Sequence, residues 1–296
     1  MTNGVLLALF AYATFSWGDA FIKGIGGGLP VFEIGFFTTA FAGVLILFSR
    51  PKEERWRDFW RMKRPWTVQA RALSGVSGGL LGIVAFTTIP FAEAYALIFL
   101  SPLFATLLSM LVLKERIGPW RWFAIFAGLA GVFLVVRPGF RELHLGHLAA
   151  IGIAFVSATT VILLRSLAGQ ERRTPILGFM ILYGLVINGS LALALGFVVP
   201  SLRQLAMLAA AGALAAVGQI LLLAATRLAP ANQIAPNQYS QIAWAVVVGT
   251  AFFGEYPDLL AILGLAVLAA AGLLTWMRER IRLGSVRWNP FFRNRL

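Results

Sequence analysis

Apolar runs, each long enough for a helix to cross a lipid bilayer, recur along the whole chain. Such a helix needs about 20 consecutive apolar residues. Ten stretches meet this requirement, at roughly 4–23, 31–49, 73–89, 91–113, 121–137, 147–165, 175–197, 205–226, 230–253 and 258–277. They leave no room for a soluble domain, and the composition agrees, since 59% of the residues are hydrophobic and only 12% are charged. We therefore predict an all-α polytopic membrane protein with ten transmembrane helices.

The basic residues are distributed unevenly between the two sides of this topology. With the N-terminus in the cytoplasm, 21 of the 25 lysines and arginines fall on the cytoplasmic side, and only four fall on the other: Lys23, Arg137, Arg141 and Arg203. This bias predicts cytoplasmic termini in a bacterial inner membrane, and it accounts for the net charge of +13 without a nucleic-acid partner. The segment 50–71 carries eight of these basic residues and three tryptophans, so we expect it to lie on anionic lipid.

A pattern near the end of the first half returns about 140 residues later. The matched positions are Pro90 with Pro230, Phe91 with Ala231, Phe104 with Trp244, and Glu115 with Glu255, each set followed by a glycine-containing helix. The first helices match more loosely, with Gly4 opposite Gly146 and Lys23 opposite Arg165. A five-helix unit therefore occurs twice. Because five is odd, the second unit enters the membrane from the opposite side. The two halves are 1–140 and 141–277, followed by a basic tail, 278–296.

These residues carry a family resemblance. The stretch PFAEAYALIFLSPLFATLLSMLVLKERIGPWRWFAIFAGLAGVFLV and its weaker second copy resemble the half-unit of EamA-type transporters, in the drug/metabolite transporter superfamily. Within it, the chain is similar to the branch of aromatic amino acid exporters. The resemblance implies export or exchange of a small metabolite by alternating access, through a cavity lined by helices 1, 3, 4, 6, 8 and 9. Inverted repeats are suited to alternating access, because the two halves can exchange conformations and so open one central site to either side in turn.

The ninth apolar stretch begins with an unusual run of amide and hydroxyl side chains. At α-helical spacing one face carries Gln233, Asn237, Gln241, Trp244 and Val248. A polar face is costly against lipid, so it must face protein or a watery cavity. Hydrogen bonding between helices is one interpretation. Substrate contact is the other, and we favour it because 91–116 shares the framework of this stretch but lacks its amides. Pro236 should distort the helix and free a backbone carbonyl near residue 232.

The fourth stretch is the partner of the ninth in the repeat. Glu93, Leu97 and Ser101 share one face there, and Tyr95 and Phe99 share the next. Glu93 would complement the dipole of the first helical turn. Ammonium binding or proton coupling is the alternative role for this carboxylate.

The first stretch carries a polar stripe of Tyr12, Ser16, Asp19 and Lys23. Asp19 and Lys23 are four residues apart and could pair. Asp19 is also the only acid well inside a predicted span, which makes it a candidate proton carrier or cation partner. Further candidates for substrate contact are Trp17, Phe86, Ser157 and Gln219.

Other activities fit the sequence less well. The chain has no cysteine, and His144 and His147, its two histidines, lack a carboxylate at ligand spacing, so we expect an interfacial pair and no metal or cofactor. A lipid-modifying enzyme would need clustered acid–base groups, a passive channel would need a continuous polar lining, and ATP drive would need a Walker loop. We predict a secondary transporter, monomeric or dimeric, for a small amphipathic metabolite, most simply an aromatic or neutral amino acid. Proton-coupled export of other metabolites or drugs is the alternative.

Overall fold

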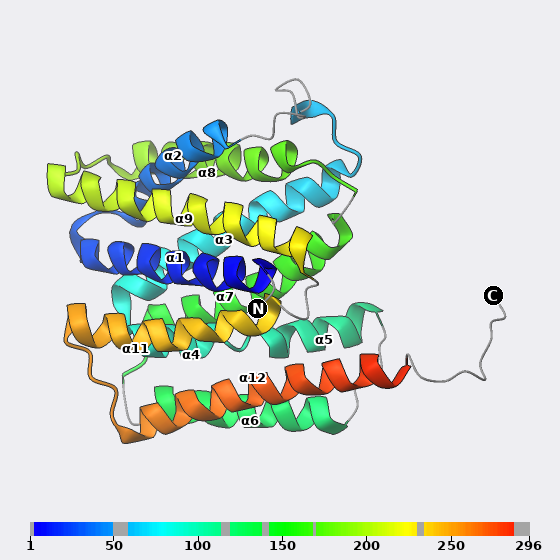
Figure 1. Ribbon diagram of the computed structural model, residues 1–296. Helices are drawn as coiled ribbons and strands as arrows, with labels where there is room; N and C mark the ends of the chain where they lie inside the picture. Colours follow the sequence, from blue (N-terminus) through cyan, green and yellow to red (C-terminus); the bar gives the residue numbers. More distant parts are fainter. Residues whose placement is uncertain are drawn as a thin grey trace.

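The computed structural model describes residues 3–49, 59–113, 119–137, 142–167, 170–229 and 234–286. These residues form helices and connecting turns, and no strand occurs in those ranges. The helices run side by side along a common direction (Figure 1). In chain order they are α1 (Asn3–Ile25), η1 (Gly26–Gly28), α2 (Val31–Phe48), α3 (Pro65–Thr88), α4 (Phe91–Ile98), α5 (Ser101–Leu113), α6 (Pro119–Val136), α7 (Leu145–Leu167), α8 (Arg173–Leu195), α9 (Leu202–Leu228), η3 (Ala235–Tyr239), α11 (Ser240–Phe253) and α12 (Leu259–Val286).

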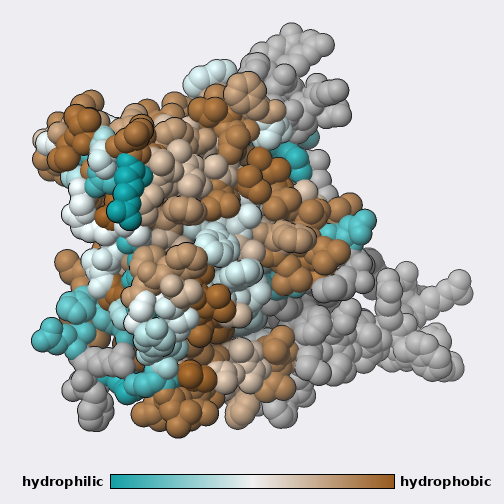
Figure 2. Space-filling view, turned by 60° about the vertical axis from the view of Figure 1, so that its left-hand side comes forward, coloured by the Kyte–Doolittle hydropathy of each residue, from teal (hydrophilic) through white to brown (hydrophobic). Residues whose placement is uncertain are grey.

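The surface of this bundle is suited to lipid. Large apolar side chains such as Phe10, Phe48 and Phe133 are 62%, 86% and 60% exposed. Apolar residues cover much of the face seen in Figure 2, and hydrophilic patches gather toward its left side. Five helical segments are long and apolar enough to cross a membrane, within Asn3–Gly28, Val31–Phe48, Pro65–Thr88, Arg173–Leu195 and Leu202–Ala225. Shorter apolar segments lie in α4–α5, α6, α7 and α12. The chain is a polytopic helical membrane protein.

The helices pack in two equivalent sets. α1 packs along α9, and its counterpart α7 packs along α3; α2 packs on α9 as α8 packs on α3. The halves are inverted, because the last turn of α1 and the first turn of α7 both lie at the start of α4, through Lys23 and His147. Each half therefore packs mainly against the other, and the sequence repeat corresponds to a structural one.

Close helix approaches occur at paired glycines. A Cβ at Gly131 in α6 would lie 2.8 Å from the carbonyl oxygen of Gly264 in α12, and a Cβ at Gly264 would lie 2.6 Å from that of Gly131. A Cβ at Gly4 would meet Ala229 after α9, and one at Gly146 would meet Thr88 at the end of α3. Since Gly4 and Gly146 are matched in the sequence repeat, the two halves use the same contact twice.

The fourth and the ninth predicted spans each contain a proline, and neither forms one continuous α-helix. The predicted span 91–113 divides into α4 and α5, because Pro102 has no N–H to donate back to the preceding turn. The span 230–253 begins as the 3₁₀ segment η3, which contains Pro236, before α11. Two boundaries also differ from prediction. α3 begins at Pro65, so Arg71 belongs to a helix and not to the interfacial segment 50–71, and α12 continues to Val286, into the predicted tail. Residues 50–58 and 287–296 lie outside the described ranges.

Candidate functional site

A central cavity of about 510 Å³ lies between the two halves. Its walls come from the predicted helices 1, 3, 4, 6, 8 and 9, here α1, α3, α4–α5, α7, α9 and η3–α11. α2 and α8, which the sequence did not assign to the cavity, also contribute. Polar lining residues come from both halves and include Asp19, Arg71, Ser157, Asn188, Gln219 and Gln241. The volume is large enough for a small metabolite.

Tyr95 joins three helices at the cavity wall. Its hydroxyl oxygen lies 2.7 Å from Asp19 Oδ2, so the O–H donates to that carboxylate. The same oxygen accepts from Gln241 Nε2 at 3.3 Å and lies 3.3 Å from the Ser16 hydroxyl. A phenol has one proton and two lone pairs, so this arrangement uses its full bonding capacity. Tyr95 is 1% exposed, whereas Asp19 is only partly buried and lines the cavity. We refer to Asp19, Tyr95 and Gln241 as the Tyr95 cluster.

The predicted site residues fall into two groups. Asp19, Phe86, Tyr95, Ser157, Gln219 and Gln241 line the cavity. Trp17 and Trp244 do not; they pack edge to face against each other, with ring centroids 6.1 Å apart. Phe99 stacks on Tyr239 at 5.0 Å, also outside the cavity lining. Asn237 donates to the carbonyl of Ile234 in its own segment at 3.1 Å, and it is absent from the lining. Gln233 lies outside the described residues.

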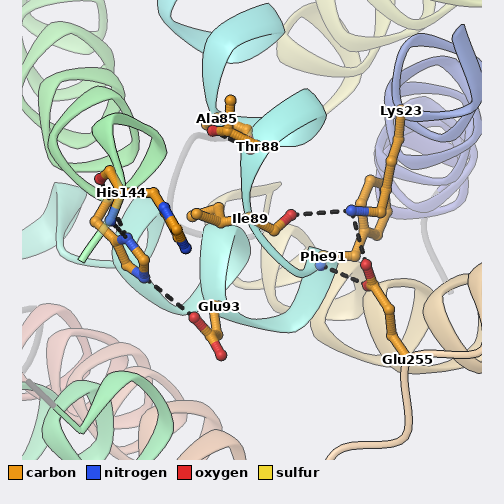
Figure 3. Close-up of polar contacts among 9 residues, drawn as sticks. Lys23, Ala85, Thr88, Ile89, Phe91, Glu93, His144 and Glu255 are labelled. Atoms are coloured by element: carbon orange, nitrogen blue, oxygen red, sulfur yellow. Dashed lines mark hydrogen bonds and ion pairs between the residues drawn. The ribbon is translucent and has the colours of Figure 1, made fainter. Parts of the chain in front are cut away.

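Lys23 does not pair with Asp19 as the four-residue spacing suggested. Its ammonium lies 2.7 Å from Glu255 Oε1 and donates to the carbonyl oxygen of Ile89 at 2.9 Å (Figure 3). The other oxygen of Glu255 accepts from the backbone N–H of Phe91 at 2.7 Å. The rings of Phe91 and Phe253 flank the ammonium, with centroids 6.0 and 5.4 Å away. This Lys23 cluster joins the end of α1, the start of α4 and the turn after α11.

Glu93 and His147 form a second buried pair beside the first turn of α4. His147 Nε2 lies 3.1 Å from Glu93 Oε2, and each side chain is 7% exposed. Figure 3 shows Glu93 directed away from Glu255, toward the segment that carries His144. Neither residue lines the cavity. The expectation of an interfacial histidine pair is thus wrong for His147, which α7 holds inside the bundle. Within the described ranges, no three potential metal ligands gather.

Several polar residues at the cavity are not among the predicted site residues. One of them is Arg71, which the run of basic residues places in the interfacial segment 50–71 and the structure places in α3. Asn188 and Gln238 also line the cavity. Asn188 is 3% exposed, and it is the only asparagine in the apolar span 175–197. A polar side chain isolated in an apolar span was therefore the signal that could have identified it.

The chain resembles known transporters over most of its length. The EamA-like transporter family matches residues 2–137. A riboflavin transporter of Rhizobium johnstonii is 32% identical over 241 residues, covering 81% of this chain and 80% of the relative. A pseudopaline exporter of Pseudomonas aeruginosa is 30% identical over 280 residues, covering 92% and 95%. An S-adenosylmethionine uptake transporter of Rickettsia prowazekii is 24% identical over 287 residues, covering 96% and 95%.

A crystal structure with 18% sequence identity shares the fold, with a TM-score of 0.67 over 95% of this chain and 98% of its own. The relatives named above are transporters or exporters, and none of them is named as an enzyme. The chain therefore belongs to the EamA-like transporters of the drug/metabolite transporter superfamily, and it is a transporter of small metabolites.

Proposed function

We propose that this protein exports or exchanges aromatic or neutral amino acids across a bacterial inner membrane, by alternating access through the central cavity. The Tyr95 cluster is the observation that carries the proposal. It places a carboxylate, a phenol and an amide together at the wall of a cavity in a membrane-embedded bundle. Such a group can bind an ammonium or another polar head, while the rings of Phe15 and Phe86 line the same cavity and suit an apolar body.

The Lys23 cluster supports alternating access. It lies where α1 ends and α4 begins, and it connects residues of both halves through Lys23 and Glu255. Neither of these residues lines the cavity. An ion pair between the halves, outside the cavity, can hold this end of the bundle closed. In the topology that the basic residues favour, this end faces outward and both termini face the cytoplasm. Alternating access requires that the bundle can close at either end in turn. The inverted halves make this possible, because each half can adopt the conformation of the other.

Counterflow in liposomes tests the proposal. Purified protein is reconstituted with unlabelled L-phenylalanine inside and labelled L-phenylalanine outside. We expect rapid exchange, slowed about two- to tenfold by Gln241→Ala, which removes one neutral hydrogen bond from the Tyr95 cluster. Gln170→Ala is the matched control, because Gln170 is exposed and does not line the cavity. Equal rates in wild type and Gln241→Ala would sink the site assignment.

Riboflavin is a second candidate substrate, favoured by the 32% identity to a riboflavin transporter. Its flavin ring is aromatic and its side chain carries hydroxyl groups, so the same cavity chemistry applies. Uptake of each labelled compound into liposomes, measured separately, distinguishes the two candidates. If labelled riboflavin enters the liposomes and labelled L-phenylalanine does not, the amino acid proposal fails and the riboflavin one stands.

A further inference from the structure

Arg71 is a buried cation at the cavity wall, and the described part of the chain gives it no counter-charge. The residue is 5% exposed, and its Nε has no hydrogen-bond partner in the described part of the chain. The contact of Nη1 is the thioether sulfur of Met180 at 3.8 Å, which is a weak acceptor. No carboxylate of the described residues lies within ion-pair distance of the guanidinium. Burial of an unpaired charge is unfavourable, so the position needs an explanation.

The side chain points away from the nearer end of its helix. α3 begins at Pro65, and long basic side chains near a helix end ordinarily extend back toward the membrane surface. Arg71 does the opposite. A Cβ built at Gly75, one turn further into the helix, would lie 2.7 Å from Arg71 Nη1. The guanidinium therefore lies over Gly75, and the missing side chain at that glycine makes its inward direction possible.

Several glycines line the cavity beside Arg71, so its wall has no side chains at these positions. α3 presents Gly75, Gly78, Gly79 and Gly82 to the cavity, and a Cβ at Gly79 would meet no atom within 4 Å. A bound molecule thus has room next to the guanidinium. Asn188 lines the same cavity, and its Oδ1 is also buried without a hydrogen-bond partner among the described residues. The cavity therefore contains two polar groups whose bonding capacity is not used by the residues that the structure describes.

We propose that Arg71 binds a carboxylate of the transported substrate. The guanidinium fork matches a carboxylate geometrically and can donate two parallel hydrogen bonds. The Tyr95 cluster would then hold the ammonium or other donor groups of the same molecule, since Asp19 supplies the complementary charge at the cavity wall. This inference rests on the proposed function, and it specifies the substrate class as zwitterionic or anionic. An uncharged molecule such as riboflavin would leave Arg71 unpaired.

The test uses the full-length protein in detergent and three indole compounds that differ only in charged groups. These are L-tryptophan, indole-3-propionate, which lacks the ammonium, and tryptamine, which lacks the carboxylate. Equilibrium binding is measured for wild type, Arg71→Gln, Arg71→Lys and the control Arg203→Gln, an exposed arginine at the start of α9. We expect Arg71→Gln to weaken L-tryptophan and indole-3-propionate by about 10- to 100-fold and to leave tryptamine unchanged. Arg71→Lys should fall between, because it keeps the charge and loses the fork.

The outcomes separate this inference from the proposed function. Unchanged tryptamine binding also shows that Arg71→Gln is folded. If all three compounds weaken by the same factor, or if wild type shows no preference for a carboxylate, the assignment of Arg71 is overturned. If wild type binds the carboxylates through Arg71 but exchanges no amino acid in liposomes, the proposed function fails and the anion site stands. If wild type exchanges L-tryptophan in liposomes and Arg71→Gln exchanges it at the same rate, the proposed function stands and the anion site at Arg71 fails.

Discussion

Lys23 Nζ lies 2.7 Å from Glu255 Oε1, which connects the first helix of the first half to the turn after α11 in the second. Lys23 also donates to the carbonyl oxygens of Ile89 and Phe86, at 2.9 and 3.4 Å. The ion pair spans the two halves, whereas the two hydrogen bonds lie within the first half, so it is the ion pair that must break if the halves separate at this end of the bundle.

Removal of the lysine should therefore open this end. The chain has no cysteine, so Ile22→Cys introduces a single thiol at the cavity wall next to Lys23. We expect Lys23→Met to increase the rate of labelling by a membrane-impermeant thiol reagent several-fold, in vesicles that expose this end. Arg203→Gln, at an exposed basic residue near the same end, is the control. Labelling at the same rate in both variants would contradict a closing role for Lys23.

Tyr95→Phe should impair both the stability and the transport step. The substitution keeps the ring packing against Phe86, at a centroid distance of 5.5 Å, but removes the hydroxyl shared by Asp19 and Gln241. We expect a loss of about 1–3 kcal/mol in the free energy of unfolding, because buried polar groups lose their partner. Thermal unfolding in detergent and the KM for labelled L-phenylalanine measure the two effects. Tyr183→Phe, on α8 outside the cavity, should change neither; equal behaviour of the two variants would rule out the role of the hydroxyl.

The fold could largely be predicted. Bilayer thickness fixes the length of an apolar span, and proline interrupts the hydrogen bonding of a helix at its own position. The spans follow from the bilayer thickness, and the inverted repeat follows from the matched residues and the odd number of helices in each half. Arg71 shows the limit of these rules. A charged residue is assigned to water by composition, and only the packing of Gly75 and Met180 around it reveals a buried position inside α3. Similarly, Pro102 carried the signal for the break between α4 and α5, but the apolar run around it suggested one helix.

The site was less predictable, because its bonds connect residues far apart in sequence. Asp19 and Gln241 stand out in the sequence as polar groups in apolar runs, and the structure joins both to Tyr95. No local pattern predicts that Lys23 pairs with Glu255 in preference to Asp19, its neighbour one turn away. The stripe through Asn237 and Trp244 assumed α-helical spacing, whereas η3 has 3₁₀ geometry, which changes the direction of each side chain.

The crossing of α6 and α12 should be sensitive to side-chain volume. Gly264→Leu would place carbon atoms where the carbonyl of Gly131 and the side chain of Val135 now lie, within 2.6 and 2.8 Å of a Cβ. We expect destabilisation by about 1–3 kcal/mol, the usual effect of overpacking. Gly128→Ala on α6 is the matched control, since a Cβ there would meet no atom within 4 Å, and it should be neutral or slightly stabilising. Thermal unfolding midpoints in detergent decide between these outcomes, and a stable Gly264→Leu protein would show that the helices are free to separate.

Asp19→Asn should separate energy coupling from exchange. Asp19 is the acid that lines the cavity within the described residues, and its carboxylate accepts a hydrogen bond from the Tyr95 hydroxyl, so it is placed to exchange a proton with a bound substrate. The amide keeps the size and the acceptor oxygen but carries no titratable proton. We therefore expect Asp19→Asn to abolish the accumulation of labelled L-phenylalanine driven by a pH gradient in liposomes, while counterflow exchange continues at a lower rate, because the amide oxygen can still accept a hydrogen bond from the substrate ammonium. Glu93→Gln, whose side chain contacts His147 outside the cavity, should retain driven accumulation. Normal accumulation by Asp19→Asn would exclude this carboxylate as the coupling group, and loss of both activities would indicate that substrate binding itself requires the charge of Asp19.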